Sequence, residues 1–533
     1  MIEGCGEQIL VASHTGEVTS GVWSAGIHDV GDVYVTGALT VEPCAVLRMA
    51  PAASLAVRTG GSLTMEGTAE ERILVTSEST TPGSWGAIEF DGDTTAEDNR
   101  LVNVDVEFGG GGGGETMVWL DNDSSVEIRD STFVDSAGAG IRADADSTLR
   151  GFEGNTISDN EGPAMHLHPS VVGDLGEGTY TPNGTNGIVV TNGVLTEDAA
   201  WTVSDAPYLL STMSVDGGKD SAVLELTEGT EIRFSPQGYL TIRDNAGLRL
   251  TGTAAGPVQI GSASPRPAAG DWEQIRIEVG SLNQSNRFEY AEFRHGGSGG
   301  VGMVWVDSDA ELAMTNCRVE QSAGPGVTVQ RYGVLGTFDD NTLVENIGPA
   351  LDIAANVVGD LGQGTYSPNG VDAIAVEGGP VSADATWLAH DAPYHLSGST
   401  RIEARAGSAV VTVSAGTQLL LGRGAGISVE DNGGLRLEGT AESRIHVASA
   451  QLPPSGGDWD YIVFESSSVE AQNVWSNVDV AHGGGAYAQL WVRSGAGLSL
   501  EDVALAESGT GCDIRVDSGA ALGFESSVGV QCD

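Results

Sequence analysis

The sequence predicts an all-β protein, a single long parallel β-solenoid built from three super-repeats of about 186 residues each. The first observation is a repeat, because GDLGEGTYTPNG at residues 173–184 returns as GDLGQGTYSPNG at residues 359–370. The second is the abundance of short runs in which apolar and polar residues alternate, without a sustained apolar stripe at helical spacing. Such short strands bury their inner faces only by stacking on neighbouring turns, which a solenoid provides.

The repeat predicts three domains. Residues 1–184 form super-repeat 1 with an N-terminal cap, residues 185–370 form super-repeat 2, and residues 371–533 form a truncated super-repeat 3 with a C-terminal cap. Tryptophan supports the division, because every tryptophan except Trp475 belongs to a set with one member in each domain. We expect the members of a set to occupy equivalent positions. The sets are Trp85, Trp272 and Trp459; Trp119, Trp305 and Trp491; and Trp23, Trp201 and Trp387.

Each super-repeat contains the same elements in the same order. Closely spaced strands fill residues 33–77, 223–262 and 410–449, and the strands WGAIEF, WEQIRI and WDYIVF follow. Segments such as NVDVEFGG come next, and their glycine runs predict turns. A propeller would repeat every 40–45 residues or so, and an array of sandwich domains would not repeat such short strands over so long a period. A solenoid with turns of roughly 20–22 residues fits best.

Several of these segments carry a family resemblance. LTVEP, the pair GTAEERILVTS and WGAIEF, NVDVEFGG and the W…PY opening of each unit resemble the repeats of exported bacterial parallel β-helix proteins, the pectate-lyase-like solenoids. The resemblance covers nearly the whole chain and implies a right-handed β-helix. It also implies a secreted or cell-surface protein, often a lipoprotein. Function does not follow from it, because this scaffold carries lyases, tailspike glycosidases and adhesins alike.

The composition is strongly acidic. The 533 residues include 74 acidic and 24 basic side chains, which gives a formal net charge of −50 at pH 7. Such a surface repels phosphate backbones and anionic lipids, which argues against nucleic acid and membrane surfaces as partners. It suits a saline habitat, where salt screens self-repulsion, or the binding of divalent cations. No apolar run is long enough for a transmembrane segment. The start, MIEGCGEQIL, contains no hydrophobic signal segment, and we expect its methionine to replace a removed export signal.

The cysteines predict a disulfide at each end. Cys512 and Cys532 lie about one turn apart, and stacked residues of adjacent turns have the Cα separation that a disulfide needs. Cys44 takes a turn position that glycine holds in the other two copies, and a bridge to Cys5 would close the N-terminal end. The alternative for Cys5 is a lipid anchor in the native precursor. Cys317 aligns with strand residues and is expected to be a buried free thiol. Two disulfides would indicate an oxidising compartment outside the cytoplasm.

The candidate ligand-binding residues are those that recur between copies, and no catalytic residue is assigned. Equivalent carboxylates suit a structural role at strand ends or turns better than one catalytic centre. Phe108 replaces histidine in the first copy, which excludes a shared proton-transfer role and favours a ring that covers the turn. The candidates are the aromatic residues Trp85, Trp272 and Trp459, the carboxylates Asp105, Glu292 and Asp479, and His295 and His482, which precede Gly-Gly.

Metal binding is a further hypothesis. His166 and His168 alternate on one strand face, as two metal ligands could, although the second copy reads LDI at residues 351–353. The segments DNDSS from Asp121 and DSDAE from Asp307 could offer oxygen ligands, which leaves Ca²⁺ open as a cofactor. Asp and Asn at turns more often bond their own backbone. No phosphate-binding loop, dinucleotide fingerprint or nucleophile elbow is present, and no other cofactor is expected.

These observations favour a non-enzymatic, exported or cell-surface rod, structural or adhesive, that presents repeated patches to a polysaccharide or cell-surface glycan. That hypothesis requires Trp85, Trp272 and Trp459 to be exposed or to lie beside exposed aromatic rings. One alternative is a polysaccharide-active enzyme, a glycosidase or lyase, with a groove holding two carboxylates on one super-repeat. The scarcity of lysine and arginine argues against acidic substrates for it. The other alternative is a stalk or spacer without a ligand.

Overall fold

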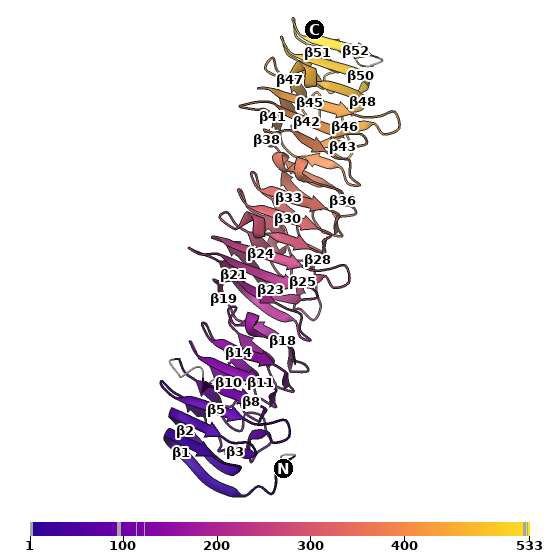
Figure 1. The fold of residues 1–533 in the computed structure, drawn as a ribbon. Helices are drawn as coiled ribbons and strands as arrows, with labels where there is room; N and C mark the ends of the chain where they lie inside the picture. Colours follow the sequence, from indigo (N-terminus) through magenta and orange to yellow (C-terminus); the bar gives the residue numbers. More distant parts are fainter. Residues whose placement is uncertain are drawn as a thin grey trace. The chain divides into compact units, whose positions relative to one another are not determined.

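The computed structural model describes residues 4–92, 98–112, 115–121, 123–525, 529 and 531–532. They form two compact units, unit 1 (Met1–Gly238 with Gly256–Ala263) and unit 2 (Tyr239–Ala255 with Ser264–Asp533). The strands of each unit stack in parallel as successive turns of a β-solenoid, about 20 turns in the whole chain (Figure 1). The prediction of an all-β parallel solenoid is therefore confirmed. The right-handed twist of the path and the domain boundaries at residues 184 and 370 stay predictions.

The described part of unit 1 consists of β-strands, short 3-10 turns and the start of β23 (Glu231–Arg243), which continues into unit 2. The remaining elements are β1 (Leu10–Trp23), β2 (Gly26–Val41), β3 (Ala45–Met49), β4 (Leu55–Val57), β5 (Ser62–Glu66), β6 (Ile73–Ser77), β7 (Ile88–Phe90), β8 (Arg100–Val102), β9 (Val104–Glu107), β10 (Thr116–Leu120), β11 (Ser125–Arg129), β12 (Thr132–Val134), β13 (Ala139–Ala143), β14 (Thr148–Glu153), β15 (Asn155–Ser158), β16 (Pro163–Leu167), η2 (Val172–Asp174), β17 (Gly178–Thr179), β18 (Thr185–Val190), β19 (Gly193–Leu195), β20 (Ala199–Trp201), β21 (Tyr208–Asp216), β22 (Ala222–Thr227) and β25 (Val258–Ser262).

Strand β2 shows how one turn supplies three faces. Its first part pairs with β3, its middle with β4 and its last part with β5. Three parallel stacks continue from there: β3, β6, β9, β12, β15 and β17; β4, β7, β10, β13, β16, β18 and β21; and β5, β8, β11 and β14. Equivalent residues on adjacent turns are commonly 23 or 24 residues apart, slightly more than expected.

Unit 2 is built in the same way. Its elements are β24 (Ala246–Thr251), β26 (Ile275–Ile277), η3 (Asn283–Ser285), β27 (Arg287–Glu289), β28 (Ala291–Arg294), η4 (Ser298–Gly300), β29 (Val304–Val306), β30 (Glu311–Thr315), β31 (Arg318–Glu320), β32 (Val327–Val329), β33 (Val334–Asp339), β34 (Asn341–Val344), β35 (Leu351–Ala354), η5 (Ala355–Asp360), β36 (Gly364–Thr365), β37 (Ile374–Glu377), β38 (Gly379–Val381), β39 (Ala385–Trp387), β40 (Tyr394–Leu396), β41 (Thr400–Ile402), β42 (Ala409–Ser414), β43 (Gln418–Leu421), β44 (Ile427–Val429), β45 (Gly433–Glu438), β46 (Ile445–Ser449), β47 (Ile462–Phe464), η6 (Glu470–Gln472), β48 (Val474–Ala481), β49 (Leu490–Val492), β50 (Gly497–Ala506), β51 (Ile514–Val516), β52 (Ala521–Glu525) and β53 (Gln531–Cys532).

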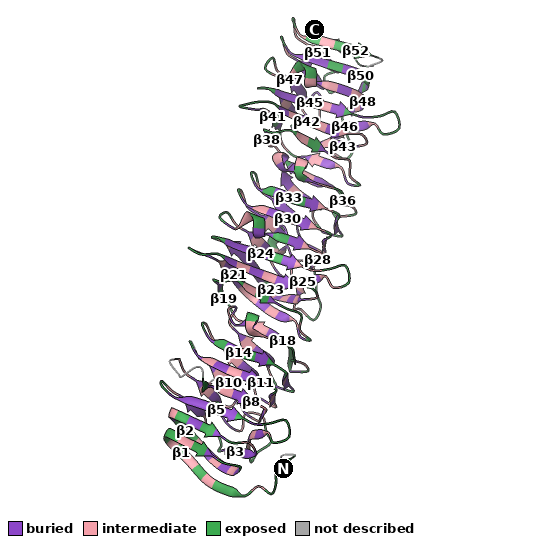
Figure 2. Cartoon of the chain, in the orientation of Figure 1, coloured by how far each residue is buried: buried purple, intermediate pink, exposed green. Residues whose placement is uncertain are grey.

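The core follows the predicted alternation. Along β3 and β22, every second residue is buried and the residues between are partly exposed. Figure 2 shows the same alternation of buried and more exposed residues along many strands. Inward apolar side chains therefore stack on those of the turns above and below, and each added turn removes apolar surface from water.

Equivalent turns of the super-repeats share unusual backbone conformations. Asn103, Tyr290 and Asn477 all have a φ of 50°, in the left-handed region that non-glycine residues rarely adopt. The most closely repeated segment, 173–184 and 359–370, is equally structural. Its tyrosines, Tyr180 and Tyr366, are buried, and each hydroxyl donates to a backbone carbonyl of the same loop. Each tyrosine therefore anchors its loop to the fold, while most other residues of the two segments are partly or fully exposed.

Both predicted disulfides are present, Cys5–Cys44 and Cys512–Cys532. Cys44 has a φ of 63°, and the glycines at this position in the other copies, Gly229 and Gly416, are left-handed as well. A sulfur atom in a disulfide cannot also carry a thioether lipid, so the structure does not support an anchor at Cys5. Cys317 is a buried free thiol, as expected.

Candidate functional site

The structure overturns the expectation that Trp85, Trp272 and Trp459 contact a ligand. All three side chains are fully buried. Their indole N–H groups donate to the backbone carbonyls of Glu107, Arg294 and Ala481 at 2.8, 2.8 and 3.0 Å. Because the rings fill the core and their one polar atom is satisfied inside it, they stabilise the fold and cannot meet a glycan.

The carboxylates Asp105 and Asp479 belong to matching ion pairs. Arg72 donates from Nε to Asp105 Oδ1 at 3.0 Å, and Arg444 donates from Nε to Asp479 Oδ1 at 3.0 Å. A second guanidinium nitrogen lies 2.8 and 2.9 Å from the same oxygens. Two-pronged contacts of this kind fix both side chains, so the geometry shows a structural role for them.

Glu292, the counterpart in the second copy, has a different partner. Pro257 stands where Arg72 and Arg444 precede their strands, and Glu292 instead lies 3.1 Å from Arg294 on its own strand. Asp105 also borders a cavity of about 860 Å³. Arg72 already neutralises the negative charge of Asp105, so this carboxylate would attract an incoming cation only weakly.

His295 and His482 occupy one turn position together with Phe108. All three residues are left-handed, with φ of 64–69°, and each backbone carbonyl accepts an N–H from the turn before. Burial lowers the pKa of His295. His482 Nε2 lies 2.7 Å from a carboxylate oxygen of Glu507. What the three positions share is therefore their backbone conformation and hydrogen bond and not an imidazole, which agrees with the phenylalanine in the first copy.

His166 and His168 do not converge with further ligands. Nδ1 of His168 lies 2.8 Å from the Ser170 hydroxyl, and burial lowers the pKa of both histidines. Among the residues that the structure describes, no group of three His, Cys, Asp or Glu side chains is placed to hold a metal ion. The calcium hypothesis stays a prediction, and DNDSS includes residue 122, which lies outside the described residues.

In another tryptophan set, Trp119 and Trp305 are partly exposed and Trp491 is buried. Trp119 lies between the buried residues Val118 and Leu120, so the alternation of β10 points its ring away from the core. In each copy, the indole N–H donates to an aspartate. The pairs are Trp119–Asp144 at 2.8 Å, Trp305–Asp307 at 2.7 Å and Trp491–Asp517 at 3.1 Å.

An arginine completes each group. Arg142 lies over the Trp119 ring at 5.2 Å and Arg515 over the Trp491 ring at 4.7 Å. In the second copy, Arg276 makes a two-pronged ion pair with the aspartate. We call these groups the Trp–Asp–Arg clusters: Trp119, Asp144 and Arg142; Trp305, Asp307 and Arg276; and Trp491, Asp517 and Arg515. Alternation within MVWL, MVWV and QLWV could have indicated the outward rings from sequence.

The third cluster extends into a larger aromatic group. The Tyr487 ring is 46% exposed and its centroid lies 4.7 Å from that of Trp491. Arg493 covers the Trp491 ring at 3.6 Å, and Trp491 itself is only 6% exposed. A ligand at this cluster would therefore meet the tyrosine and the arginines first.

The second and third clusters lie on different faces of unit 2. Trp305 lies on β29, in the stack of β26, β29, β32, β35, β37, β40, β43 and β46. The last of these strands, β46, pairs with the second half of β48, which contains Asp479. Trp491 lies on β49 in a separate sheet with β38, β41, β44, β47, β51 and β53. Because equivalent tryptophans lie on different faces, one super-repeat does not contain a whole number of turns. A straight polymer that follows one face of unit 2 would contact only one of these two clusters.

A pocket of about 270 Å³ opens beside Trp305. Trp305, Thr328 and Asp352 are paired across three successive turns, on β29, β32 and β35. Glu377, at the end of β37, and Arg331 complete the wall. Burial and, second, the charge of Glu377 raise the pKa of Asp352 to about 6.

These carboxylates belong to the second copy alone. In the first copy, Arg142 and His166 follow Trp119 on the next two turns. In the third copy, Arg515 and Cys532 follow Trp491. The difference between LDI and HLH is visible in the sequence, but the placement of its aspartate near a tryptophan two turns away depends on the register of the stacked strands.

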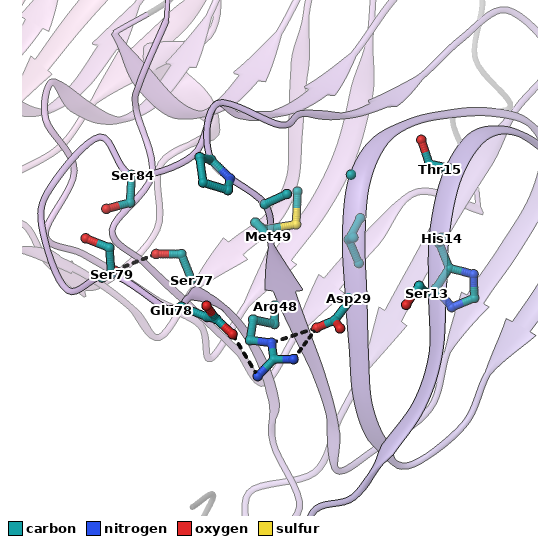
Figure 3. Close-up of a pocket in the computed structure, with 14 residues that line it drawn as sticks. Ser13, His14, Thr15, Asp29, Arg48, Met49, Ser77, Glu78, Ser79 and Ser84 are labelled. Carbon is teal, nitrogen blue, oxygen red and sulfur yellow. Dashed lines mark hydrogen bonds and ion pairs between the residues drawn. The ribbon is translucent and has the colours of Figure 1, made fainter.

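A second pocket, of about 640 Å³, lies near β1, β2 and β3 of unit 1 (Figure 3). Arg48 lies between Asp29 and Glu78, at 2.6 and 3.2 Å, so its charge is already neutralised. His14 also borders the pocket, and burial together with His28 lowers its pKa. The remaining wall is mainly serine hydroxyls and small apolar groups, which would suit a neutral polar ligand.

Comparison with known protein families, curated proteins and solved structures finds no match. No helix of the described residues is both long and apolar enough to cross a membrane.

Proposed function

We propose that this protein is an exported, non-enzymatic β-solenoid that contacts carbohydrate through its Trp–Asp–Arg clusters. The observation that carries the proposal is the equivalent tryptophan in each copy, with its N–H fixed by an aspartate and an arginine beside it. The partly exposed rings of Trp119 and Trp305 offer apolar surface to the C–H groups of a sugar ring, and the neighbouring Asp and Arg offer hydrogen bonds to its hydroxyls; at the third cluster, Tyr487 and the arginines over Trp491 take this part.

Repetition favours a binding role over catalysis. A catalytic centre needs one complete set of groups, whereas three similar weak sites increase the avidity for a polymer. Because two clusters of unit 2 lie on different faces, we propose that they contact separate chains or a branched glycan. This arrangement suits a structural or adhesive protein embedded in a polysaccharide layer.

Export is supported by the disulfides. The chain contains the disulfides Cys5–Cys44 and Cys512–Cys532, and such bonds persist in oxidising compartments. The acidic surface keeps the protein soluble and disfavours anionic partners. A glycan without acidic groups is therefore the expected partner.

A glycan array followed by sedimentation with the best polysaccharide tests the proposal. We expect Trp119→Ala, Trp305→Ala and Trp491→Ala each to weaken retention about tenfold or less, and the triple variant to abolish it. Tyr239→Ser, which alters an exposed aromatic residue outside the clusters, is the matched control. Retention of the triple variant at the wild-type level would refute the proposal. Absence of any binding would favour a spacer, and release of new reducing ends would favour an enzyme.

A further inference from the structure

The pocket beside Trp305 contains two carboxylates that no cation neutralises. Within the described part of the chain, neither Asp352 nor Glu377 forms an ion pair or accepts a hydrogen bond. Arg331 borders the same pocket, but its guanidinium donates to the backbone carbonyl of Gly378 at 3.0 Å. The pocket therefore differs from the ion pairs at Asp105 and Asp479, where an arginine is already bound.

The strand register places the two carboxylates on one wall. Asp352 pairs with Ala375 and Ala354 pairs with Glu377, so both acidic residues face outward on adjacent strands, offset by two positions. From the usual strand spacings, their Cβ atoms lie about 8 Å apart. A small group between them can contact both carboxylates at once, and Trp305 lies on the same stack, two turns from Asp352 and three turns from Glu377.

We propose that this pocket binds an ammonium group carried by a ligand the size of a monosaccharide. An ammonium between Asp352 and Glu377 gains from both charges and relieves their mutual repulsion. The sugar ring that carries the ammonium can at the same time lie against Trp305, which borders the same pocket. A pocket of about 270 Å³ accommodates one sugar ring and excludes larger ligands.

The charges of the pocket disfavour the other ligand classes. A carboxylate or sulfate on the ligand would meet two like charges, and a neutral sugar would leave their repulsion unchanged. The inference does not depend on the proposed glycan contacts, because Trp119 and Trp491 lack this carboxylate pair and take no part in it.

Affinity should depend on the ionisation of Asp352, whose pKa lies near 6 in the free protein. Glu377 from β37 and Arg331 from the segment after β32 border the same pocket, Arg276 and Asp307 surround the Trp305 indole, and His395 is two turns along the same stack. Binding of a cation favours the ionised carboxylate, so the affinity should fall as the pH drops below about 6, by about tenfold per unit at the limit.

Calorimetric titration of the whole protein with glucosamine, at pH 7 and pH 5, tests the inference. Glucose and N-acetylglucosamine are the matched neutral probes. We expect glucosamine to bind about tenfold more tightly than either, and Asp352→Asn or Glu377→Gln to remove about tenfold of that affinity. Glu345→Gln makes the same change of charge elsewhere in unit 2 and should leave binding unchanged. Circular dichroism of each variant confirms that it is folded.

Four results would overturn the inference. Neutral sugars could bind as well as glucosamine, Asp352→Asn could retain full affinity in a folded protein, or glucosamine could fail to bind at all. Release of reducing ends from an oligosaccharide, lost in Asp352→Asn, would assign the carboxylates to hydrolysis and would equally overturn it. Loss of polysaccharide retention in the Trp119 and Trp491 variants, with glucosamine binding intact, would separate this inference from the proposed function.

Discussion

An alanine Cβ placed at Gly109 would lie 2.7 Å from Cζ2 of the Trp85 indole. Gly296 stands in the same relation to Trp272, with a Cβ 2.7 Å from Cε2. The first glycine of each run therefore exists because the buried tryptophan of the preceding turn occupies the space of a side chain. This relation explains why W-x-x-I and Gly-Gly recur together. The first run extends to residues 113 and 114, which lie outside the described residues.

We predict that Gly109→Ala destabilises unit 1 by about 1–3 kcal/mol, because a rigid ring and the backbone must both move to admit the methyl group. Urea unfolding followed by tryptophan fluorescence measures the change. Trp85→Phe in the same background should recover part of the loss, since the smaller ring frees space, and a double-mutant cycle would show the coupling.

Gly6→Ala is the control for this prediction, because nothing lies within 4 Å of the methyl position there. It should be neutral or slightly stabilising. Equal destabilisation by Gly6→Ala and Gly109→Ala would show that lost glycine flexibility, and not the contact with Trp85, is responsible.

The fold could be predicted from sequence because period-two alternation and a long internal repeat both determine stacking. The repeat also located the disulfides, since Cys44 stands at a glycine turn position. The alternation of apolar and polar residues did not reveal whether an aromatic ring just before a strand is buried. Trp85 precedes its strand, at a corner where the chain turns inward, and periodicity carries no information there.

The disulfide at the N-terminal end gives a second prediction. Its loop of 39 residues corresponds to about 4 kcal/mol of lost unfolded-state entropy at most. Cys5→Ser/Cys44→Ser should therefore lower the stability of unit 1 by roughly 2–4 kcal/mol.

Glycine at position 44 should recover part of that loss. Cys5→Ser/Cys44→Gly should be about 1 kcal/mol more stable than the double serine variant, because glycine adopts a positive φ without strain. Urea midpoints of the two variants decide the matter. A double serine variant at least as stable as the glycine variant would contradict the argued backbone role of this position.

Asparagine side chains that link turns give a third prediction. Asn346 accepts the Ser322 N–H at 3.0 Å and donates to the Val319 carbonyl and Asn369. Asn346→Ala leaves several buried groups without partners and should cost about 2–4 kcal/mol. Asn356→Ala, at a side chain without a hydrogen bond in the described part, should change the urea midpoint little. Similar losses in both variants would contradict this account.

The candidate sites were harder to predict than the fold, for a physical reason. Trp305, Thr328 and Asp352 are separated by more than 20 residues each along the chain, and only the stacking register brings them together. Repetition drew attention to Asp105 and Asp479, yet equivalent residues in a repeat protein usually solve the same structural problem. The informative residue was the one that differed, Asp352 where the first copy has His166.

The raised pKa of Asp352 gives the last prediction, on stability. The folded state binds its proton more tightly than the unfolded chain, with a pKa near 6 in place of 3.8. The ionised group is therefore a cost that is absent below about pH 4, grows as the pH rises towards 6 and stays constant above it. Asp352→Asn removes this cost and should stabilise unit 2 by about 1 kcal/mol at pH 7.5, after allowance for partial exposure, but not at pH 4. Urea midpoints at both pH values, with Glu345→Gln as control, measure it. If Asp352→Asn increases stability equally at the two pH values, packing of the amide and not the buried charge is responsible. An increase confined to high pH fits a carboxylate that is retained, at the expense of stability, to bind a cationic ligand.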